Sequence, residues 1–194
     1  MKKLYLTLTL ISAFSFIASG QQSVAVKLQS GTYHMEAQSE IELPALTLEE
    51  KNAQASLYLF SFTQIPSDAD RQKLNQSGLQ IIGYFPEKTY LVNRTSSAQI
   101  PAIVHLNSVV PFAGKMKYSR RVLNREFPDY ALNGSGIKLV LKTVPSHNIT
   151  YQLRELQKMK VEVTGYRAEL NTIDINTTWE QVSKIAQLPF VHFL

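Results

Sequence analysis

A weak internal repeat constrains the fold of this chain more than any other feature of its sequence. The stretch "GYFPEKTYLV" begins at Gly83, and "GYRAELNTIDI" begins at Gly165, 82 positions further on. Each begins Gly-Tyr and carries a glutamate four positions after the glycine, at Glu87 and Glu169. Self-similarity at one fixed spacing is typical of duplicated supersecondary units, so the chain is predicted to contain two copies of one unit.

The repeat extends well beyond these two stretches. An offset of 82 aligns the two copies without a gap from Leu74 to Phe112, with pairs such as Leu74 and Leu156. Upstream the offset becomes 79, because "QIPS" at 64–67 matches "TVPS" at 143–146. A three-residue insertion in one helix is the expected reason for this change.

The two copies are predicted to have the same order of elements. In the second copy "GIKLVLKTV", "VEVTGY", "NTIDIN" and "FVHFL" indicate strands, the spacing of Ile149, Leu153 and Leu156 indicates a helix, and Thr178 with Gln181 forms a capping box for another. In the first copy we expect strands at Leu57–Phe62, Leu79–Tyr84, Thr89–Asn93 and near Val109, and helices at Ser67–Gln76 and Ile100–Leu106.

The order β-α-β-β-α-β predicts an α+β fold made of two tandem ferredoxin-like units, each an antiparallel sheet with both helices on one face. The predicted organisation is a signal peptide at 1–20, an N-terminal extension at 21–54, the first unit at 55–112, a basic connector at 113–134 and the second unit at 135–194. In the extension, "SVAVKLQSG" is a candidate edge strand.

The open sheet faces of the two copies are expected to differ. Alternation assigns polar residues to the second: Lys138, Val140, Lys142, Glu162, Thr164, Thr172, Asp174 and His192. The aligned face of the first copy is apolar, and its candidate interface residues are Leu57, Leu59, Ile82, Tyr84, Tyr90 and Val92. Soluble monomers rarely expose so large an apolar patch, so it is expected to be covered by the N-terminal segment, by the second copy or by a partner protein.

The first residues have the layout of a secretory signal peptide. Lys2 and Lys3 precede the uncharged apolar run "LYLTLTLISAFSFIA", and small residues lead to a cleavage site near Gly20 and Gln21. No second apolar run of that length follows. We therefore expect an exported protein (periplasmic, cell-surface or secreted) with no stable membrane span after removal of the signal.

Composition and charge narrow the classes of partner. The absence of cysteine excludes disulfides and thiolate metal sites. The net charge of +5 includes two signal-peptide lysines, and the basic residues are not massed on one predicted helix, which argues against nucleic acid. One cluster stands out, and it is interpreted as part of a solvated connector rather than a phosphate or lipid patch: Lys115, Lys117, Arg120, Arg121 and Arg125.

No catalytic motif is evident in the sequence. The histidines, at His34, His105, His147 and His192, have no neighbours at metal-ligand spacing, and neither a Gly-x-Ser-x-Gly elbow nor a Walker loop is present. The sequence therefore predicts no catalytic residue, no metal and no cofactor. It leaves the oligomeric state open.

The first copy resembles the N-terminal pro-region of secreted subtilisin-like serine peptidases. The resemblance lies in "YLFSFTQIPSDADRQKLNQSGLQIIGYFPEKTYLV" and "IVHLNSVVPF". The matching residues are Pro66, Gly78, Ile81, Gly83, Tyr84, Pro86, Tyr90, Leu91, Val92, Leu106 and Val109. The second copy keeps Gly165, Tyr166, Leu188 and Val191 but lacks the proline and tyrosine of the hairpin.

This resemblance implies a ferredoxin-like propeptide that assists the folding of a peptidase domain, packs its sheet on that domain and inhibits it, in cis or in trans. The chain lacks the Asp-Ser/Thr-Gly, His-Gly-Thr and Gly-Thr-Ser motifs of the peptidase domain itself. It is therefore expected to be non-catalytic, as the N-terminal fragment of a larger peptidase precursor or as a free-standing relative. The alternative is an exported protein-binding or adaptor module of the cell envelope.

Overall fold

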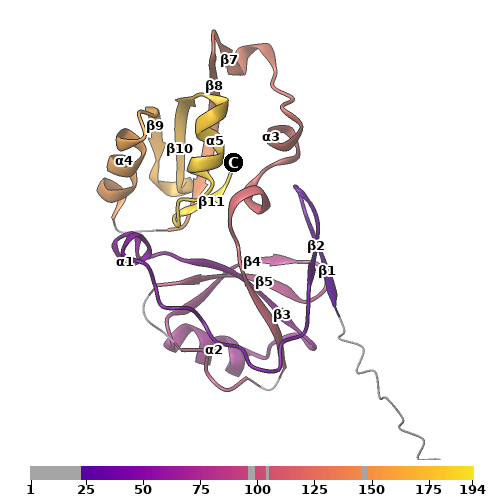
Figure 1. Cartoon of the computed structure of the whole chain (residues 1–194). Helices are drawn as coiled ribbons and strands as arrows, with labels where there is room; N and C mark the ends of the chain where they lie inside the picture. The colour runs from indigo at the N-terminus through magenta and orange to yellow at the C-terminus, as the bar shows by residue number, and fades with distance from the viewer. Residues whose placement is uncertain (1–22, 96–98, 104, 146–147) are drawn as a thin grey trace, which may run out of the picture.

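The computed structural model describes residues 23–95, 99–103, 105–145 and 148–194. It has a mixed α+β structure with few helices, and every pair of neighbouring strands in the described chain is antiparallel (Figure 1). The predicted signal peptide and its cleavage site near Gly20 and Gln21 lie outside the described residues.

The first four-stranded sheet carries one helix on one of its faces. Its elements are β3 (Leu57–Phe62), α2 (Asp68–Gln76), β4 (Leu79–Phe85), β5 (Thr89–Arg94) and β6 (Leu106–Pro111). The strands lie in the order β4-β5-β3-β6. The helix α2 packs on the sheet through Leu74, which shares a small hydrophobic cluster with Phe60 and Tyr90.

The second sheet has the same strand order relative to the chain. Its elements are β8 (Gly136–Thr143), α4 (Ile149–Lys158), β9 (Glu162–Arg167), β10 (Thr172–Thr177), α5 (Trp179–Ile185) and β11 (Val191–Phe193). The order is β11-β8-β10-β9, with the short strand β7 (Leu132–Asn133) added beside β8. The predicted capping box is confirmed, because the Gln181 side chain accepts from the backbone N–H of Thr178.

The N-terminal segment forms a separate hairpin rather than an edge strand. Strand β1 (Val24–Leu28) pairs only with β2 (Gly31–Met35), in a two-stranded sheet. The expectation that "SVAVKLQSG" extends a larger sheet is therefore wrong. A short helix, α1 (Leu48–Ala53), follows and lies beside α4 in the second unit (Figure 1).

The helix predicted at Ile100–Leu106 is absent from the described part of that range. Residues 99–103 have no regular structure, and Leu106 is already the first residue of β6. Pro101 gives the physical reason, since proline lacks an N–H and drives the preceding residue away from helical geometry. Within the described residues, the first sheet therefore has one helix on its face and the second has two.

The two copies of the repeat have a β-bulge at corresponding positions of their sheets. A β-bulge lies at Ile82, between Ile81 and Gly83, and another at Thr164, between Val163 and Gly165, so both copies have it immediately before the repeated glycine. The insertion expected in one helix is smaller than predicted: α2 has 9 residues and α4 has 10. Pro145-Ser146 aligns with Pro66-Ser67, where Ser67 is the N-cap of α2, but the N-cap of α4 is Asn148; Ser146 lies outside the described residues.

One large hydrophobic cluster runs through both four-stranded sheets. It contains Leu59 and Leu91 of the first sheet and Leu141 and Ile173 of the second. Phe112 belongs to the same cluster and directly follows β6 in the segment that joins the two sheets. The two halves of the molecule are thus joined by buried apolar contacts and not by the covalent connection alone.

No helix in the described ranges combines the length and the apolar character needed to cross a membrane.

Candidate functional site

The six residues predicted to form one interface lie on two different faces of the first sheet. Leu57, Leu59 and Ile82 belong to the large cluster on the face away from α2. Tyr90 and Val92 lie on the opposite face, in the small cluster beneath α2. The prediction that all six share one open face is therefore wrong.

The sixth residue, Tyr84, is the only member of the predicted patch that is well exposed. It is 61% exposed, whereas Leu59 and Val92 are fully buried. Tyr84 lies opposite Tyr90 across the β4–β5 ladder, and their rings make an edge contact with centroids 5.2 Å apart. It offers one aromatic ring at a sheet edge rather than a continuous apolar surface.

Tyr90 and Val92 were assigned to the wrong face because the β9–β10 hairpin of the second unit is longer than the β4–β5 hairpin of the first. Phe85 pairs with Thr89 across three intervening residues, whereas Arg167 pairs with Thr172 across four. The alignment without a gap therefore slips by one residue within the hairpin. Because side chains alternate along a strand, a slip of one residue exchanges the two faces.

The face of the first sheet opposite α2 is covered by the chain itself. Val26 of β1 and Met35 of β2 are 0% and 1% exposed and belong to the same cluster as Leu57 and Leu59. The hairpin contacts both edges of the sheet, β4 through β1 and β6 through β2. Of the alternatives considered from sequence, cover by the N-terminal segment is observed, and the same buried cluster continues into the second unit.

The chain after β2 continues this cover along the outer edge of β6. The backbone N–H of Gln38 donates to the carbonyl oxygen of Asn107 at 2.9 Å, and its side-chain oxygen accepts from the N–H of Val109 at 3.0 Å. Such bonds satisfy edge groups that would otherwise be free to pair with another chain.

The open face of the second sheet is polar, as predicted, and Lys138, Glu162 and Thr164 on it are exposed, but the expectation that the whole face meets water is wrong for two residues: Thr172 is buried and His192 is half-buried against Phe112. Arg167 and Asp174 form an ion pair of 2.7 Å across β9 and β10, and Asn176 donates to Glu162 at 3.0 Å. Val140 is an exposed apolar residue near the centre of this face, 51% accessible. This face therefore combines a polar surround with one apolar centre.

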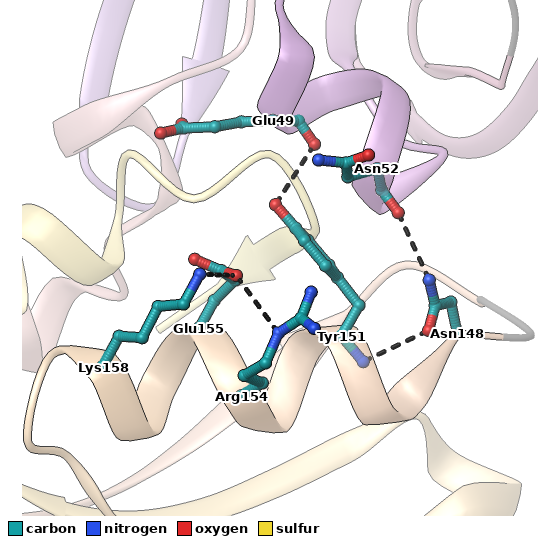
Figure 2. Close-up of polar contacts among 7 residues, drawn as sticks. All are labelled: Glu49, Asn52, Asn148, Tyr151, Arg154, Glu155 and Lys158. Carbon is teal, nitrogen blue, oxygen red and sulfur yellow. Dashed lines mark hydrogen bonds and ion pairs between the residues drawn. The ribbon is translucent and has the colours of Figure 1, made fainter.

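A helix pair fastens the N-terminal extension to the second unit (Figure 2). The Tyr151 hydroxyl donates to the carbonyl oxygen of Glu49, and the Asn148 side-chain N–H donates to that of Asn52, both at 3.4 Å. These acceptors lie in α1 and the donors at the start of α4. The contacts link segments about a hundred residues apart in the chain.

The interpretation of the basic cluster as solvated is wrong for one residue. Lys117 is 1% exposed, while Lys115, Arg120, Arg121 and Arg125 remain on the surface. The Lys117 ammonium donates to the carbonyl oxygen of Leu188 at 2.8 Å, and burial lowers its pKa to about 7. The apolar flanks Met116 and Tyr118 are the sequence signal that could have separated it from the cluster.

Lys117 also marks the place where the last strand meets the connector. Its carbonyl oxygen accepts from the N–H of Leu194 at 2.9 Å, and Ser119 donates to the Leu194 carbonyl at 2.7 Å. The pKa of the nearby His192 is lowered to about 4. Burial is the largest cause, and the positive charges of Lys142 and Lys117 add to it. The junction is therefore a poorly solvated region with cationic character that sequence reasoning did not find.

The remaining histidines are dispersed. His34 is exposed on β2, His105 lies just before β6, and His147 is outside the described residues. Within the described ranges no three histidine or carboxylate side chains cluster in a way that could hold a metal ion.

Comparison with known protein families matches residues 27–113 to a family described as a domain of unknown function (DUF8729). The matched range begins within β1 and ends after Phe112, so it includes the end of β1, the whole of β2 and the sheet that the hairpin covers. No curated protein and no solved structure matches the chain.

Proposed function

We propose that the chain consists of two tandem ferredoxin-like units and acts as an exported, non-catalytic, propeptide-like module. In this proposal it binds a subtilisin-like serine peptidase, assists its folding and inhibits it, in cis or in trans. The order β4-β5-β3-β6, repeated as β9-β10-β8-β11, supports the architectural part, since it is the strand order expected of a split βαβ unit.

The observation that carries the functional part is the β4–β5 hairpin. The residues of the pro-region resemblance occupy special positions there: Gly83 follows the bulge, and Pro86 begins the turn. A Cβ added at Gly83 would lie 3.4 Å from the Cβ of Leu91, an ordinary van der Waals contact with the neighbouring strand. The hairpin therefore places the residues of the resemblance at its bulge and its turn, and this supports the resemblance on which the functional part rests.

The surface offered to a peptidase differs from the one expected from sequence. The apolar face of the first sheet is occupied by the protein's own hairpin, which leaves the open face of β8, β9 and β10 as the uncovered sheet face. We assign the contact to this face, with Val140 at its centre and the exposed Lys138 beside it on the same strand.

Inhibition of a purified subtilisin-like peptidase by the protein without its signal peptide tests this proposal. We expect binding in the micromolar range or tighter, slow cleavage of the bound protein and weaker inhibition by Val140→Asp. The matched control is Lys158→Asp, at an exposed position of α4 away from this face. Absence of binding and inhibition at micromolar concentration would remove the peptidase from the proposal.

A second candidate is an exported adaptor that binds a different protein. It is favoured by the hairpin cover, because the sheet face that the resemblance assigns to the peptidase is not free in the first unit. Affinity capture from an envelope fraction distinguishes the two candidates. Recovery of a partner that is lost with Val140→Asp, with no peptidase among the proteins captured, would favour the adaptor.

A further inference from the structure

A pocket of about 330 Å³ lies where the β1–β2 hairpin, the first sheet and the last strand of the second sheet meet. Its walls come from five places in the chain: Leu28 at the end of β1, Phe85 at the end of β4, Phe112 and Met116 in the connector, Lys142 of β8 and His192 of β11. Its volume falls in the range of small-molecule sites, about 300–1,000 Å³.

The pocket is apolar on one side and cationic on the other. Phe112 is one of the lining residues, and the centroid of its ring lies 6.3 Å from that of Phe85 and 6.5 Å from that of His192. The charged side chain in the lining is Lys142 of β8, and none of the described residues that line the pocket is acidic. Apolar walls with a few placed polar groups are the usual composition of a ligand site.

Lys142 keeps hydrogen-bonding capacity for a ligand. Its ammonium donates to the carbonyl oxygen of Leu170, and an ammonium has three donors, so two remain. Burial is the main reason that the pKa of His192 is lowered, and the positive charges of Lys142 and Lys117 add to it. The imidazole is therefore neutral near pH 7, and the field at this end of the pocket is positive.

We propose that this pocket binds a small amphipathic carboxylate, with the apolar body against Phe85, Phe112 and Met116 and the carboxylate at Lys142. At roughly 30 Å³ for each water-sized group, the volume admits about a dozen non-hydrogen atoms, the size of a medium-chain fatty acid. Such a ligand would touch the hairpin and both sheets together. The inference does not depend on a peptidase partner.

Isothermal titration calorimetry with three probes that each carry an unbranched ten-carbon chain tests the proposal on the protein without its signal peptide. The probes are decanoate, decanol and decyltrimethylammonium, which share an apolar chain and differ in the charge of the head group. We expect decanoate to bind about tenfold or more tightly than decanol, because a charge-assisted hydrogen bond is added. We expect the cationic probe not to bind.

Two substitutions on one strand locate the carboxylate. Lys142→Gln should weaken decanoate about tenfold, to the level of decanol, and leave decanol unchanged. Lys138→Gln is the matched control, since it removes the same charge from the same face of β8 but lies outside the pocket. Circular dichroism checks that both variants are folded.

The comparison of the three probes uses the unmodified protein, so it tests the proposal even if a variant does not fold. Equal affinities for the three probes, or no heat with decanoate at millimolar concentration, would overturn the proposal. Equal weakening by Lys142→Gln and Lys138→Gln would place the anion elsewhere and overturn it as well.

Discussion

Lys117 shows how one buried amine can make the stability of this protein depend on pH. An ordinary lysine has a pKa of 10.5, but burial lowers the pKa of Lys117 to about 7. Between these values the unfolded chain binds more protons than the folded one. The free energy of unfolding therefore rises with pH in this window, by at most about 1.4 kcal/mol per pH unit.

Replacing Lys117 by methionine should remove this dependence. Lys117→Met keeps an unbranched apolar side chain of similar length, so we expect higher stability at pH 7 and a flat profile from pH 7 to 9.5. Urea unfolding at several pH values measures the effect. The exposed Lys115→Met is the control and should retain the slope; a slope unchanged in Lys117→Met would contradict the assignment.

His192 is expected to make the stability of the protein depend on pH in the acidic range. Its pKa falls from 6.5 to about 4 in the folded protein, so the unfolded chain takes up a proton first as the pH decreases. The stability that the neutral imidazole provides is present above pH 6.5 and is lost as the pH falls toward 4. His192→Phe, which preserves an aromatic ring beside Phe112, should reduce this loss.

Thermal unfolding between pH 7 and 4.5 measures the contribution of His192. The substitution of the exposed His34 by phenylalanine is the control, and it should leave the pH profile unchanged. If His192→Phe and the original protein lose stability in parallel over this range, the histidine is not the group responsible.

At the scale of single elements, the start of α2 depends on a local capping box. The Ser67 hydroxyl accepts from the backbone N–H of Asp70, and the Asp70 carboxylate accepts from both the hydroxyl and the N–H of Ser67. The Ser67 hydroxyl and N–H are the main causes that lower the pKa of Asp70. These bonds satisfy donors that the first turn of a helix leaves free.

Ser67→Ala should therefore cost about 1 kcal/mol of unfolding free energy. Chemical denaturation measures it, with Gln72→Ala, at an exposed position inside the same helix, as the control. The control should be neutral or slightly stabilising, because alanine favours helix. Equal effects of the two substitutions would mean that the cap contributes nothing measurable.

The elements themselves were largely predictable, since alternation and capping are local signals. The limits of β3 agree with the expected range, and those of α2, β4, β5 and β10 differ from it by one residue. The prediction of a helix at Ile100–Leu106 was wrong because the second copy has a helix at the aligned positions, whereas Pro101 disfavours one in the first copy. Tyr90 and Val92 were assigned to the wrong face of the sheet. The hairpin of the second copy has one additional residue, which an alignment at low sequence identity does not reveal, and this residue reverses the alternation of side chains.

At the scale of the whole molecule, the β1–β2 hairpin is predicted to stabilise the first sheet from outside it. Met35 is 1% exposed and belongs to the cluster that contains Leu59. Met35→Ala should cost about 2–5 kcal/mol, the usual range for truncating a fully buried side chain. Its exposed neighbour provides the control, His34→Ala, which should be close to neutral.

Hydrogen exchange reports on the same cover without a global unfolding experiment. The amides of Leu57–Phe62 should exchange slowly in the unmodified protein and faster in Met35→Ala, because the central strand β3 would lose its outer layer. Fast exchange across β3 in the unmodified protein would show that the hairpin is not held on the sheet in solution.

The duplicated β-α-β-β order, the caps and most strands could be predicted from the sequence, because they follow from neighbours within a few residues. Three properties could not: which face of a sheet each side chain occupies, what covers the first sheet, and how Lys117 comes to be buried. Those properties depend on hairpin length and on contacts between distant segments, such as Val26 with the cluster around Leu59. The alternation of apolar and polar residues along a strand does not report contacts between distant segments. A single additional residue in a hairpin reverses the sheet faces that this alternation predicts.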